Sequence, residues 1–283
     1  MEADSLDGER ATRIGATRVE HHEHVPTARL SGLVERAVGY RLSGFPAGIH
    51  VGMPSRTVTL VVPLGQPLTV ADGGGLPRSH SSVVAGLSAA PSHIHHDGAQ
   101  HGVQLALRPE AVRALFGMPA AELASRSYDL SDVVGAQAET LRDRVHGAEA
   151  WPDRFGLVDD WLVGLLDRAP RLGTPDPEVL EAWRLIGVSG GSVPVRDVAA
   201  RVGWSMRRLQ SRFRHEFGVS PKTVAVLRRF ERSVPLVAGR RHALTDVALR
   251  CGWTDHAHMD RDWRALAGTS PTRWRTEDVL AAH

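Results

Sequence analysis

The last third of the chain contains an internal repeat, and this repeat constrains the fold more than any other feature. Residues 197–221 read DVAARVGWSMRRLQSRFRHEFGVSP, and residues 246–271 read DVALRCGWTDHAHMDRDWRALAGTSP. The two segments share Asp-Val-Ala, an Arg, Gly-Trp, a hydroxyl residue, aromatic and apolar residues, a Gly and Ser-Pro. Their offset is 49 residues up to Trp253 and 50 residues after it. Each copy must therefore fold into the same supersecondary unit.

Each copy predicts a helix-turn-helix unit. In the first copy a short helix over residues 197–202 precedes a turn at Gly203, and Ser205 supplies a hydroxyl N-cap for a second helix. In the second copy the turn glycine is Gly252 and the expected cap is Thr254, with one additional residue in the turn or in the first helical turn. In DNA-binding proteins, two short helices joined by a tight turn place the second helix in the major groove.

The second helix of each copy separates into an apolar and a polar face at 3.6-residue spacing. The apolar stripes, which predict the packing faces, are Leu209, Phe213 and Phe217 in the first copy and Met259, Trp263 and Leu266 in the second. The opposite positions are Arg207, Arg208, Gln210, Ser211 and Arg214 in the first copy, and His256, Ala257, His258, Asp260, Arg261 and Arg264 in the second. Arg and Gln donate to acceptors on base edges in the major groove, which admits one α-helix. These faces favour DNA reading; the alternative is that they are ordinary solvated helix faces.

The last hundred residues resemble the DNA-binding domain of the AraC/XylS family of transcription regulators. Within residues 246–274, the resemblance is carried by Ala248, Gly252, Trp253, Arg261, Trp263, Gly268, Ser270 and Pro271. Trp253 stands where the family usually has Phe or Tyr, and Trp263 where it usually has Phe. The resemblance implies two helix-turn-helix units, joined by a long helix, whose recognition helices enter successive major grooves on one side of the duplex.

The resemblance also implies roles for individual residues. The base-facing positions would be Arg207, Gln210 and Ser211 in the first unit and His256, Ala257, Asp260 and Arg261 in the second. Arg208, Arg214 and Arg264 are further expected DNA contacts, and the helix N-termini at Ser205 and Thr254 are expected to assist at phosphates. The implied partners are double-stranded promoter or operator DNA, RNA polymerase, a small-molecule effector and a second copy of the chain.

Two residues depart from a simple pair of DNA-reading units. Pro235 falls in the expected connecting helix over residues 222–238, where a proline removes a backbone hydrogen bond and is predicted to kink or end the helix. Asp260 is an acidic residue on a groove-facing helix. It can accept a hydrogen bond from a cytosine amino group, but elsewhere it repels phosphate.

Charge is divided unequally along the chain. Residues 178–283 contain 18 Lys and Arg against 11 Asp and Glu, a net charge of +7, whereas residues 1–177 contain 16 against 21, a net charge of −5. A basic part next to an acidic remainder is typical of a phosphate-binding module joined to one that does not bind nucleic acid. The sequence has no apolar run that spans a bilayer, no signal-peptide core and one cysteine, Cys251, which we predict to be buried. We therefore expect a cytoplasmic protein without a membrane partner.

The N-terminal half predicts an antiparallel sheet followed by helices. Residues 1–24 are polar and charged and are expected to form a flexible arm. Strands are predicted over residues 57–64, 68–71, 82–87 and 102–107, and helices over residues 109–116, 137–146 and 152–167. The predicted fold class is therefore α+β: a barrel-like antiparallel sheet module with helices, followed by an all-α domain of two helix-turn-helix units.

Residues 169–177 contain three prolines and mark a domain boundary. We expect an N-terminal effector or dimerisation domain over residues 25–168, an AraC-type DNA-binding domain over residues 178–275 and a tail over residues 276–283. The apolar stripe of the last N-terminal helix can pack on the sheet or on a second subunit; it comprises Phe155, Val158, Trp161, Leu162 and Leu165. The N-terminal half resembles, less specifically, modules that precede AraC-type domains, which implies a regulatory role but names no effector.

One cluster has the residue types of a metal site. It contains His93, His95, His96, Asp97 and His101, and imidazole and carboxylate groups together suit zinc or iron. If the segment is a strand, His93 and His95 share a face and His96 does not. The alternative, a polar turn between strands, is the interpretation that we adopt, so we predict no metal and no cofactor.

The sequence contains no motif for catalysis. It has no Walker glycine loop, no Gly-x-Ser-x-Gly elbow and no His-Glu-x-x-His, so we predict no catalytic residues and no enzymatic activity. The predicted function is a DNA-binding transcription regulator modulated by a small molecule or by dimerisation. The alternative is a ligand-binding or enzymatic N-terminal module that a helix-turn-helix domain tethers to DNA.

Overall fold

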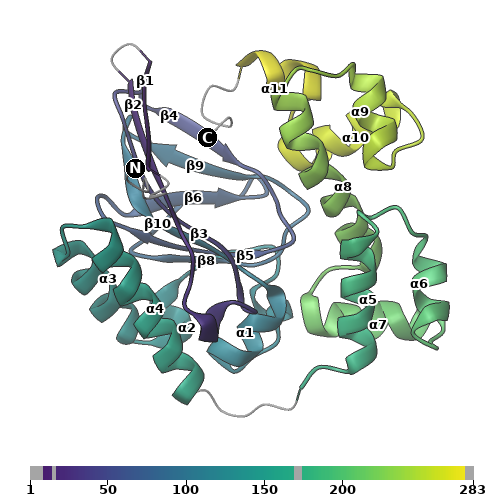
Figure 1. The fold of residues 1–283 in the computed structure, drawn as a ribbon, viewed down its shortest axis with the longest axis horizontal. Coiled ribbons are helices and arrows are strands. Elements are labelled where there is room, and N and C mark those ends of the chain that lie inside the picture. Colours follow the sequence, from purple (N-terminus) through teal and green to yellow (C-terminus); the bar gives the residue numbers. More distant parts are fainter. Residues whose placement is uncertain (1–8, 15–16, 169–173, 278–283) are drawn as a thin grey trace, which may run out of the picture.

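The computed structural model describes residues 9–14, 17–168 and 174–277, which form an antiparallel β domain followed by a helical domain (Figure 1). The predicted α+β class is confirmed. The larger sheet has seven strands in the spatial order β1 (Glu9–Ile14), β2 (Thr17–His24), β3 (Val34–Ser43), β10 (Gln100–Leu107), β5 (Val58–Pro63), β8 (Val83–Ala85) and β11 (Ser127–Asp129). The smaller sheet has the order β4 (Gly48–Gly52), β9 (Ser92–His96), β6 (Leu68–Asp72) and β7 (Arg78–His80). All of these pairings are antiparallel.

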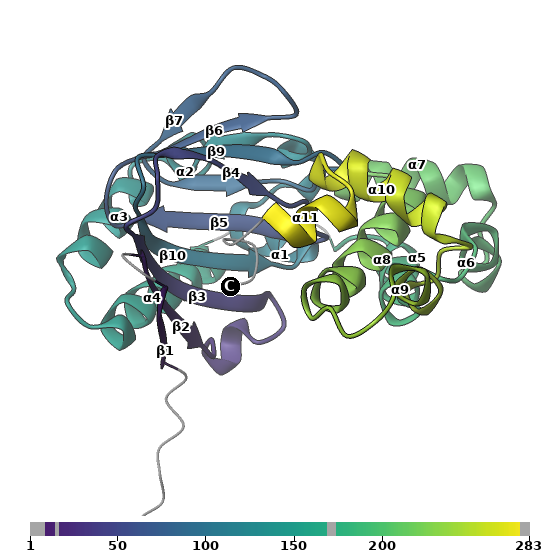
Figure 2. The same ribbon diagram turned by 90° about the horizontal axis from the view of Figure 1, so that it is seen from above.

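The two sheets lie against each other, and Figure 2 shows the smaller one over one side of the larger one, with the helical domain beside both. Strand β5 has apolar side chains on both of its faces. Val58, Leu60 and Val62 point to one face and join the main hydrophobic core, while Val61 points between the sheets. Because successive side chains of a strand alternate between faces, a strand with apolar residues on both faces is buried on both. The β-branched segment at residues 57–64 is therefore a central strand, as predicted.

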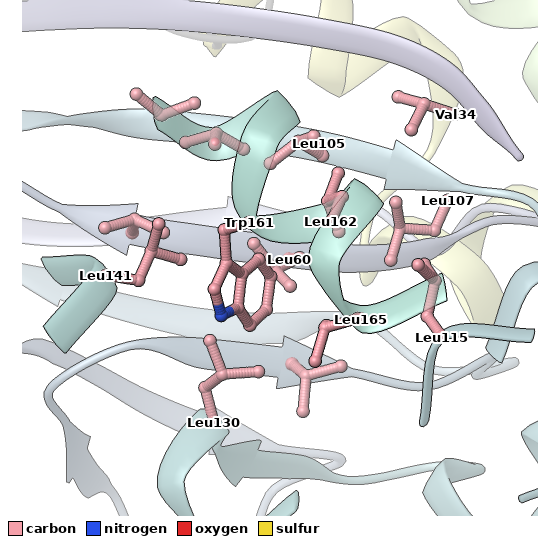
Figure 3. Packing of buried hydrophobic residues seen from close by; sticks show 14 of the residues in the cluster. Val34, Leu60, Leu105, Leu107, Leu115, Leu130, Leu141, Trp161, Leu162 and Leu165 are labelled. Carbon is pink, nitrogen blue, oxygen red and sulfur yellow. The ribbon is translucent and has the colours of Figure 1, made fainter. Parts of the chain in front are cut away.

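Helices cover the outer face of the larger sheet. The N-terminal domain contains η1 (Ala28–Leu30), α1 (Pro109–Phe116), η2 (Ala120–Leu123), α2 (Leu130–Val134), α3 (Gln137–Gly147) and α4 (Trp151–Arg168). Trp161, Leu162 and Leu165 of α4 pack on Leu60 and Leu105 of the sheet (Figure 3). The apolar stripe of α4 is thus part of this chain's own core, which decides between the two partners that the sequence left open.

The expectation of a flexible arm over residues 1–24 is wrong for residues 9–14, which form β1, and for residues 17–24, which form β2 and pair with β3. Although this segment is polar, its imidazole rings pack against aromatic side chains of α4. His24 stacks on Phe155, with ring centroids 4.5 Å apart, and its Nε2 lies 3.1 Å from Asp159 Oδ2. His22 stacks on Trp151. Strand β1 pairs with β2, and residues 1–8 lie outside the described residues.

The helical domain contains α5 (Pro177–Val188), α6 (Val195–Arg201), α7 (Met206–Phe217), α8 (Pro221–Ala238), α9 (Leu244–Cys251), α10 (His256–Ala267) and α11 (Pro271–Glu277). One hydrophobic cluster lies among α5, α6, α7 and the start of α8, and a second lies among the rest of α8, α9, α10 and α11. Of the expected boundary, residues 169–173 lie outside the described residues, and α5 already begins at Pro177. Within the described part of the chain, no helix has both the length and the apolar character required to cross a membrane.

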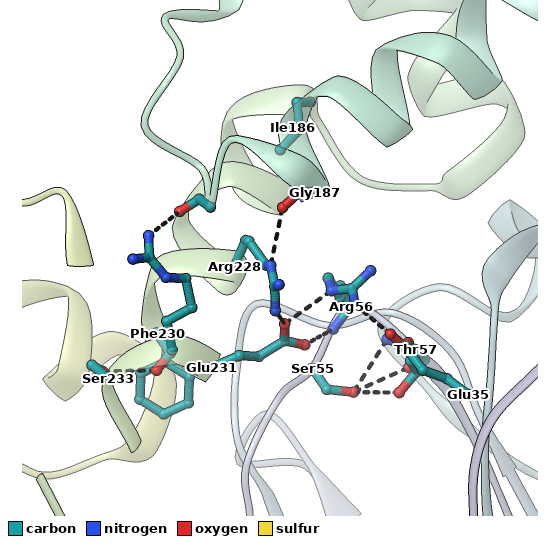
Figure 4. Close-up of polar contacts among 12 residues, drawn as sticks. Glu35, Ser55, Arg56, Thr57, Ile186, Gly187, Arg228, Phe230, Glu231 and Ser233 are labelled. Atoms are coloured by element: carbon teal, nitrogen blue, oxygen red, sulfur yellow. Dashed lines mark hydrogen bonds and ion pairs between the residues drawn. The ribbon is translucent and has the colours of Figure 1, made fainter. Parts of the chain in front are cut away.

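The N-terminal domain contacts both halves of the helical domain. Toward the first half, the Arg113 guanidinium of α1 binds the buried Glu216 carboxylate of α7, with N–O distances of 3.1 and 2.5 Å. Toward α8, the backbone N–H and the Nε of Arg56 donate to Glu231 at 2.8 and 3.0 Å, and Arg56 also binds Glu35 (Figure 4). Because paired charges at partly buried sites fix geometry, these two ion pairs orient the domains.

Candidate nucleic-acid interface

The first helix-turn-helix unit has the geometry that the sequence predicts. Helix α6 ends before Gly203, which adopts a φ of 71°, a conformation that favours glycine. Helix α7 begins at Met206, and the Ser205 hydroxyl caps it by accepting a hydrogen bond from the backbone N–H of Arg208 at 3.3 Å. Gly218 ends α7 in the left-handed conformation.

The apolar stripe of α7 and the positions predicted for DNA contact lie on different faces of the helix. Leu209, Phe213 and Phe217 are completely buried and pack against Trp183. The polar positions predicted for DNA contact are all exposed; they are Arg207, Arg208, Gln210, Ser211 and Arg214. The Arg208 guanidinium lies over the Trp204 ring at 4.5 Å from its centroid, which holds this cation near the start of the helix.

A shallow depression lies at the start of α7. It is lined by Ser205, Arg207, Arg208, Ser211 and Arg212. Arg212 was not among the predicted site residues; its Nε donates to Asp176 Oδ2 at 2.6 Å, and this interaction raises the pKa of Arg212. Three guanidinium groups near free N–H groups at a helix N-terminus form a surface that attracts anions.

In the second unit the predicted cap is wrong. Helix α10 begins at His256 and is capped by Asp255, whose carboxylate accepts from the backbone N–H of His258 at 2.7 Å. Thr254 lies in the turn before the cap, and its hydroxyl contacts Asp255 and His258 instead. The additional residue of the second repeat is thus in the turn. The 50-residue offset from Ser205 leads to Asp255, so the sequence contained the signal for this cap.

The apolar stripe of α10 is confirmed, because Met259, Trp263 and Leu266 are buried. On the other face, Ala257, Arg261 and Arg264 are exposed, and His256 and Asp260 are partly exposed. Asp260 Oδ2 accepts from Arg264 Nε at 2.9 Å, so these two predicted contact residues neutralise each other in this conformation. The structure thus places all five residues on one helix but pairs two of them.

A further carboxylate of the second unit, Asp262, contacts the turn that precedes α10. Asp262 accepts a hydrogen bond from Trp253 Nε1 at 2.7 Å, and His258 Nε2 lies 3.7 Å from the same carboxylate oxygen. Asp262 therefore fixes the turn tryptophan against α10.

Pro235 does not end the connecting helix. Helix α8 runs from Pro221 to Ala238, and the last turn is closed by the backbone N–H of Gly239, which donates to Pro235 O at 3.0 Å. The missing N–H of a proline removes one intrahelical bond, but residues after it can continue the helix. Buried Phe230 and Val237 hold α8 on the second hydrophobic cluster on both sides of Pro235.

A cavity of about 350 Å³ lies between the two sheets of the N-terminal domain. Its apolar wall includes Val38, Val61, Leu68, Val70, Val83 and Ile94. Tyr40 also faces it, and burial raises the pKa of this phenol. Polar side chains on the same lining include His21, Arg36 and His50, and Arg36 Nη2 lies 3.2 Å from Glu23 Oε1. Such a volume is within the usual range of small-molecule sites.

The histidines of residues 93–101 are not brought together. Residues 92–96 form β9 rather than a turn, so the adopted turn interpretation is wrong for that part of the segment. His101 lies on β10, where its ring packs on Trp151 and where burial, with nearby Arg41, lowers its pKa to about 4. Among the described residues, no group of three or more His, Cys, Asp or Glu has the arrangement of a metal site.

Comparison with known proteins supports the helix-turn-helix assignment. A family model described as a helix-turn-helix domain matches residues 198–277. A segment of 63 residues is 30% identical to the probable transcriptional regulator LumQ from Photobacterium leiognathi, and this match spans 22% of the present chain and 25% of LumQ. The carboxyl-terminal part of the chain is thus similar to helix-turn-helix proteins, among them a probable transcriptional regulator.

The likeness to solved structures extends over both domains. The structure of unsaturated fatty acid-bound ToxT from Vibrio cholerae strain SCE256 has a TM-score of 0.53 with 10% identity, over 92% of this chain and 99% of ToxT. A second ToxT structure, solved at 1.65 Å, has a TM-score of 0.50 with 12% identity, over 85% and 97% of the two chains. At this identity the likeness concerns the fold alone: a sheet domain followed by two helix-turn-helix units.

Proposed function

We propose that this protein is a sequence-specific DNA-binding regulator of transcription that acts through both helix-turn-helix units. The observation that carries the proposal is the common division of faces in α7 and α10. Each helix buries an apolar stripe and exposes a side with hydrogen-bond donors, among them Arg207 and Gln210 on α7 and Arg261 on α10. Since the major groove admits one helix and offers acceptors to Arg and Gln, this division suits base reading.

In the first unit, Arg207, Gln210 and Ser211 are the proposed base contacts, because they lie on the exposed side of α7. Arg208 and Arg214 are proposed to contact phosphates. The depression at the start of α7, with its guanidinium groups and helix N-terminus, is the proposed position of one phosphate. Phosphate contacts orient the helix in the groove, and base contacts select the sequence.

In the second unit, His256, Ala257, Asp260 and Arg261 are the proposed base contacts, and Arg264 is a proposed phosphate contact. To accept a hydrogen bond from a cytosine amino group, Asp260 must either break its ion pair with Arg264 or accept from both groups at once. The N-terminus of α10 is capped by a carboxylate, which offsets the attraction of the helix end for phosphate. The second unit is therefore proposed to bind phosphate less strongly than the first.

Selection of bound fragments from random DNA by the full-length protein tests this function. We expect a common sequence made of two tandem half-sites, with centres about 10 base pairs apart, and hydroxyl-radical protection of two adjacent major grooves. The mass of the complex reports whether one copy or a homodimer occupies the site, and transcription from a promoter carrying it reports an effect on RNA polymerase. Recovery of unrelated sequences would contradict the proposal.

The proposal includes an effector: a largely apolar small molecule with one polar end, bound in the cavity between the sheets. The apolar wall and the polar residues His21, Arg36 and His50 support this chemistry. The fold neighbour ToxT binds an unsaturated fatty acid, which makes such a fatty acid the first probe. The loop after β4 offers a route to the helical domain, because Met53 and Ser55 line the cavity while Arg56 binds Glu231 of α8.

A ligand shifts a conformational equilibrium only if it binds the two states with different affinity. The test is the melting temperature of the protein, and its affinity for the selected DNA, with and without the unsaturated fatty acid. We expect both to change for the unaltered protein and neither to change for Ala85→Phe, which fills the cavity. The fatty acid should be recovered unchanged; turnover would favour an enzymatic N-terminal module instead. An equal response of the Ala85→Phe variant would place the ligand elsewhere.

A further inference from the structure

Helix α8 belongs to both helix-turn-helix units. Its first part contributes Val224 and Ala225 to the hydrophobic cluster of the first unit, and its later part contributes Phe230 and Val237 to that of the second. Among the described residues, the two clusters share no buried side chain. The relative orientation of the units therefore depends on α8, on polar contacts made across it, and on the ion pairs that the N-terminal domain makes with α7 and α8.

Arginines of α8 bind the backbone near the ends of neighbouring helices. Arg228 Nε donates to Gly187 O of α5, in the first unit, at 3.2 Å (Figure 4). Arg229 Nη1 donates to Gly252 O, in the second unit, at 3.3 Å. In these hydrogen bonds each of the two arginines reaches one unit.

Arg232 reaches both units. Its Nη1 donates to Gly190 O, in the turn between α5 and α6, at 3.4 Å. Its Nη2 donates to Arg250 O, in the last turn of α9, at 3.0 Å. The last carbonyls of a helix have no intrahelical donor and carry partial negative charge, so they attract a cation. The planar guanidinium has N–H donors on both terminal nitrogens and can join two carbonyls that lie side by side.

Gly190 leaves the space that Arg232 occupies. This glycine is buried and has a φ of 63°, and a Cβ added to it would lie 2.2 Å from Arg232 Nη1. A side chain at position 190 would therefore displace the guanidinium. In the observed arrangement the Arg232 guanidinium occupies the space beside residue 190, and the positive φ at that residue also favours glycine.

We propose that Arg232 is a positioning residue that fixes the angle between the two units, so that α7 and α10 meet one duplex together. This proposal rests on the proposed DNA-binding function. When one unit has bound, the effective concentration of the other at its half-site depends on how narrowly its orientation is restricted. Arg232 restricts that orientation by joining carbonyl oxygens of the two units.

The test compares two duplexes: the sequence recovered by selection, and the same sequence with the half-site of the second unit scrambled. The measured quantity is the ratio of the two affinities for the full-length protein. Arg232→Ala should lower this ratio about tenfold while leaving affinity for the scrambled duplex within about twofold. Arg228→Ala is the matched control, because it removes an arginine of α8 whose backbone contact is with the first unit and not with the second. This variant should keep the ratio.

Gly190→Ala provides a second route to the same state, because its methyl group displaces Arg232 without removing it. We expect the same lowered ratio, and circular dichroism and melting of each variant verify the fold. If Arg232→Ala does not fold, Arg232→Lys serves in its place, since an ammonium cannot span both carbonyls. An unchanged ratio in a folded Arg232 variant overturns the inference. If the unaltered protein bound neither duplex, the proposed function itself would fail, and the inference with it.

Discussion

The two helix-turn-helix units share one backbone plan but differ in the charge of their recognition helices. Helix α7 exposes Arg207, Arg208 and Arg214, beside a helix N-terminus capped by a neutral serine. Helix α10 also carries arginines, but Asp260 binds Arg264, and the cap is the carboxylate of Asp255. The two units therefore have the same fold but are expected to attract phosphate with different strength. We expect the first unit to supply most of the attraction for phosphate, while both units carry proposed base contacts.

The largest effect should follow from removing the central aromatic residue of either unit. Phe213→Ala and Trp263→Ala each delete a completely buried ring, and each should lower the free energy of unfolding by about 3–5 kcal/mol in urea denaturation. Since the two aromatic residues belong to different clusters, Phe213→Ala should mainly weaken binding at the first half-site, and Trp263→Ala at the second.

Trp263→Phe is the control for this prediction, because it keeps one aromatic ring in the core while it removes part of the indole, including the N–H that donates to Ser233 Oγ at 2.9 Å. Loss of this hydrogen bond should cost about 1 kcal/mol. Equal loss of binding at both half-sites in Trp263→Ala would show that the units do not act separately.

Next in size are the proposed base contacts. Arg207→Ala and Arg261→Ala should each cost about 1–3 kcal/mol at one base pair of the selected site and relax the preference there. Arg208→Ala changes a neighbouring residue that is a proposed phosphate contact. It should weaken binding to all sequences and reduce the slope of log affinity against log salt concentration by about one. Gel-shift titrations at several salt concentrations measure both effects. A uniform loss across sequences for Arg207→Ala would make this residue a phosphate contact.

The periodicity of the sequence was sufficient to predict the helix-turn-helix units. Apolar spacing fixed which face of α7 is buried, and Pro109 at the first position of α1 marked the start of that helix. These features are local, because they depend on residues three or four positions apart. The exposed positions of both recognition helices followed from the same spacing, although their contacts with DNA stay predictions.

Features that depend on distant residues were missed. Residues 17–24 form a strand that pairs with β3, and His24 on this strand stacks on Phe155 and contacts Asp159 of α4. Asp159 lies 135 positions away in the sequence. The ion pairs of Arg113 with Glu216 and of Arg56 with Glu231 join residues from different domains. The error at Thr254 was of another kind: Thr and Asp are both good caps, and only the repeat offset distinguished them.

The smallest effects concern the caps. Ser205→Ala removes the hydroxyl that accepts from Arg208 N–H and should lower the free energy of unfolding by about 1 kcal/mol at any pH. Asp255 differs because it titrates. The backbone N–H of His258, with Thr254 and nearby Arg261, lowers the pKa of Asp255 in the folded state. A lowered pKa means that the charged cap stabilises the fold fully above the unfolded value of about 3.9, and that this stabilisation is lost as pH falls through the lower folded value.

Asp255→Asn tests this difference, because asparagine caps a helix without titrating. The free energy of unfolding of the unaltered protein, minus that of Asp255→Asn, should be constant between about pH 7 and pH 5 and should fall in more acidic solution. The corresponding difference for Ser205→Ala should not vary over that range. The subtraction removes other acidic groups with lowered pKa, such as Asp129, which are common to both proteins. If this difference in the free energy of unfolding stayed constant into acid, the charge of Asp255 would add no stability. The charged carboxylate would then cap the helix no better than a neutral acceptor.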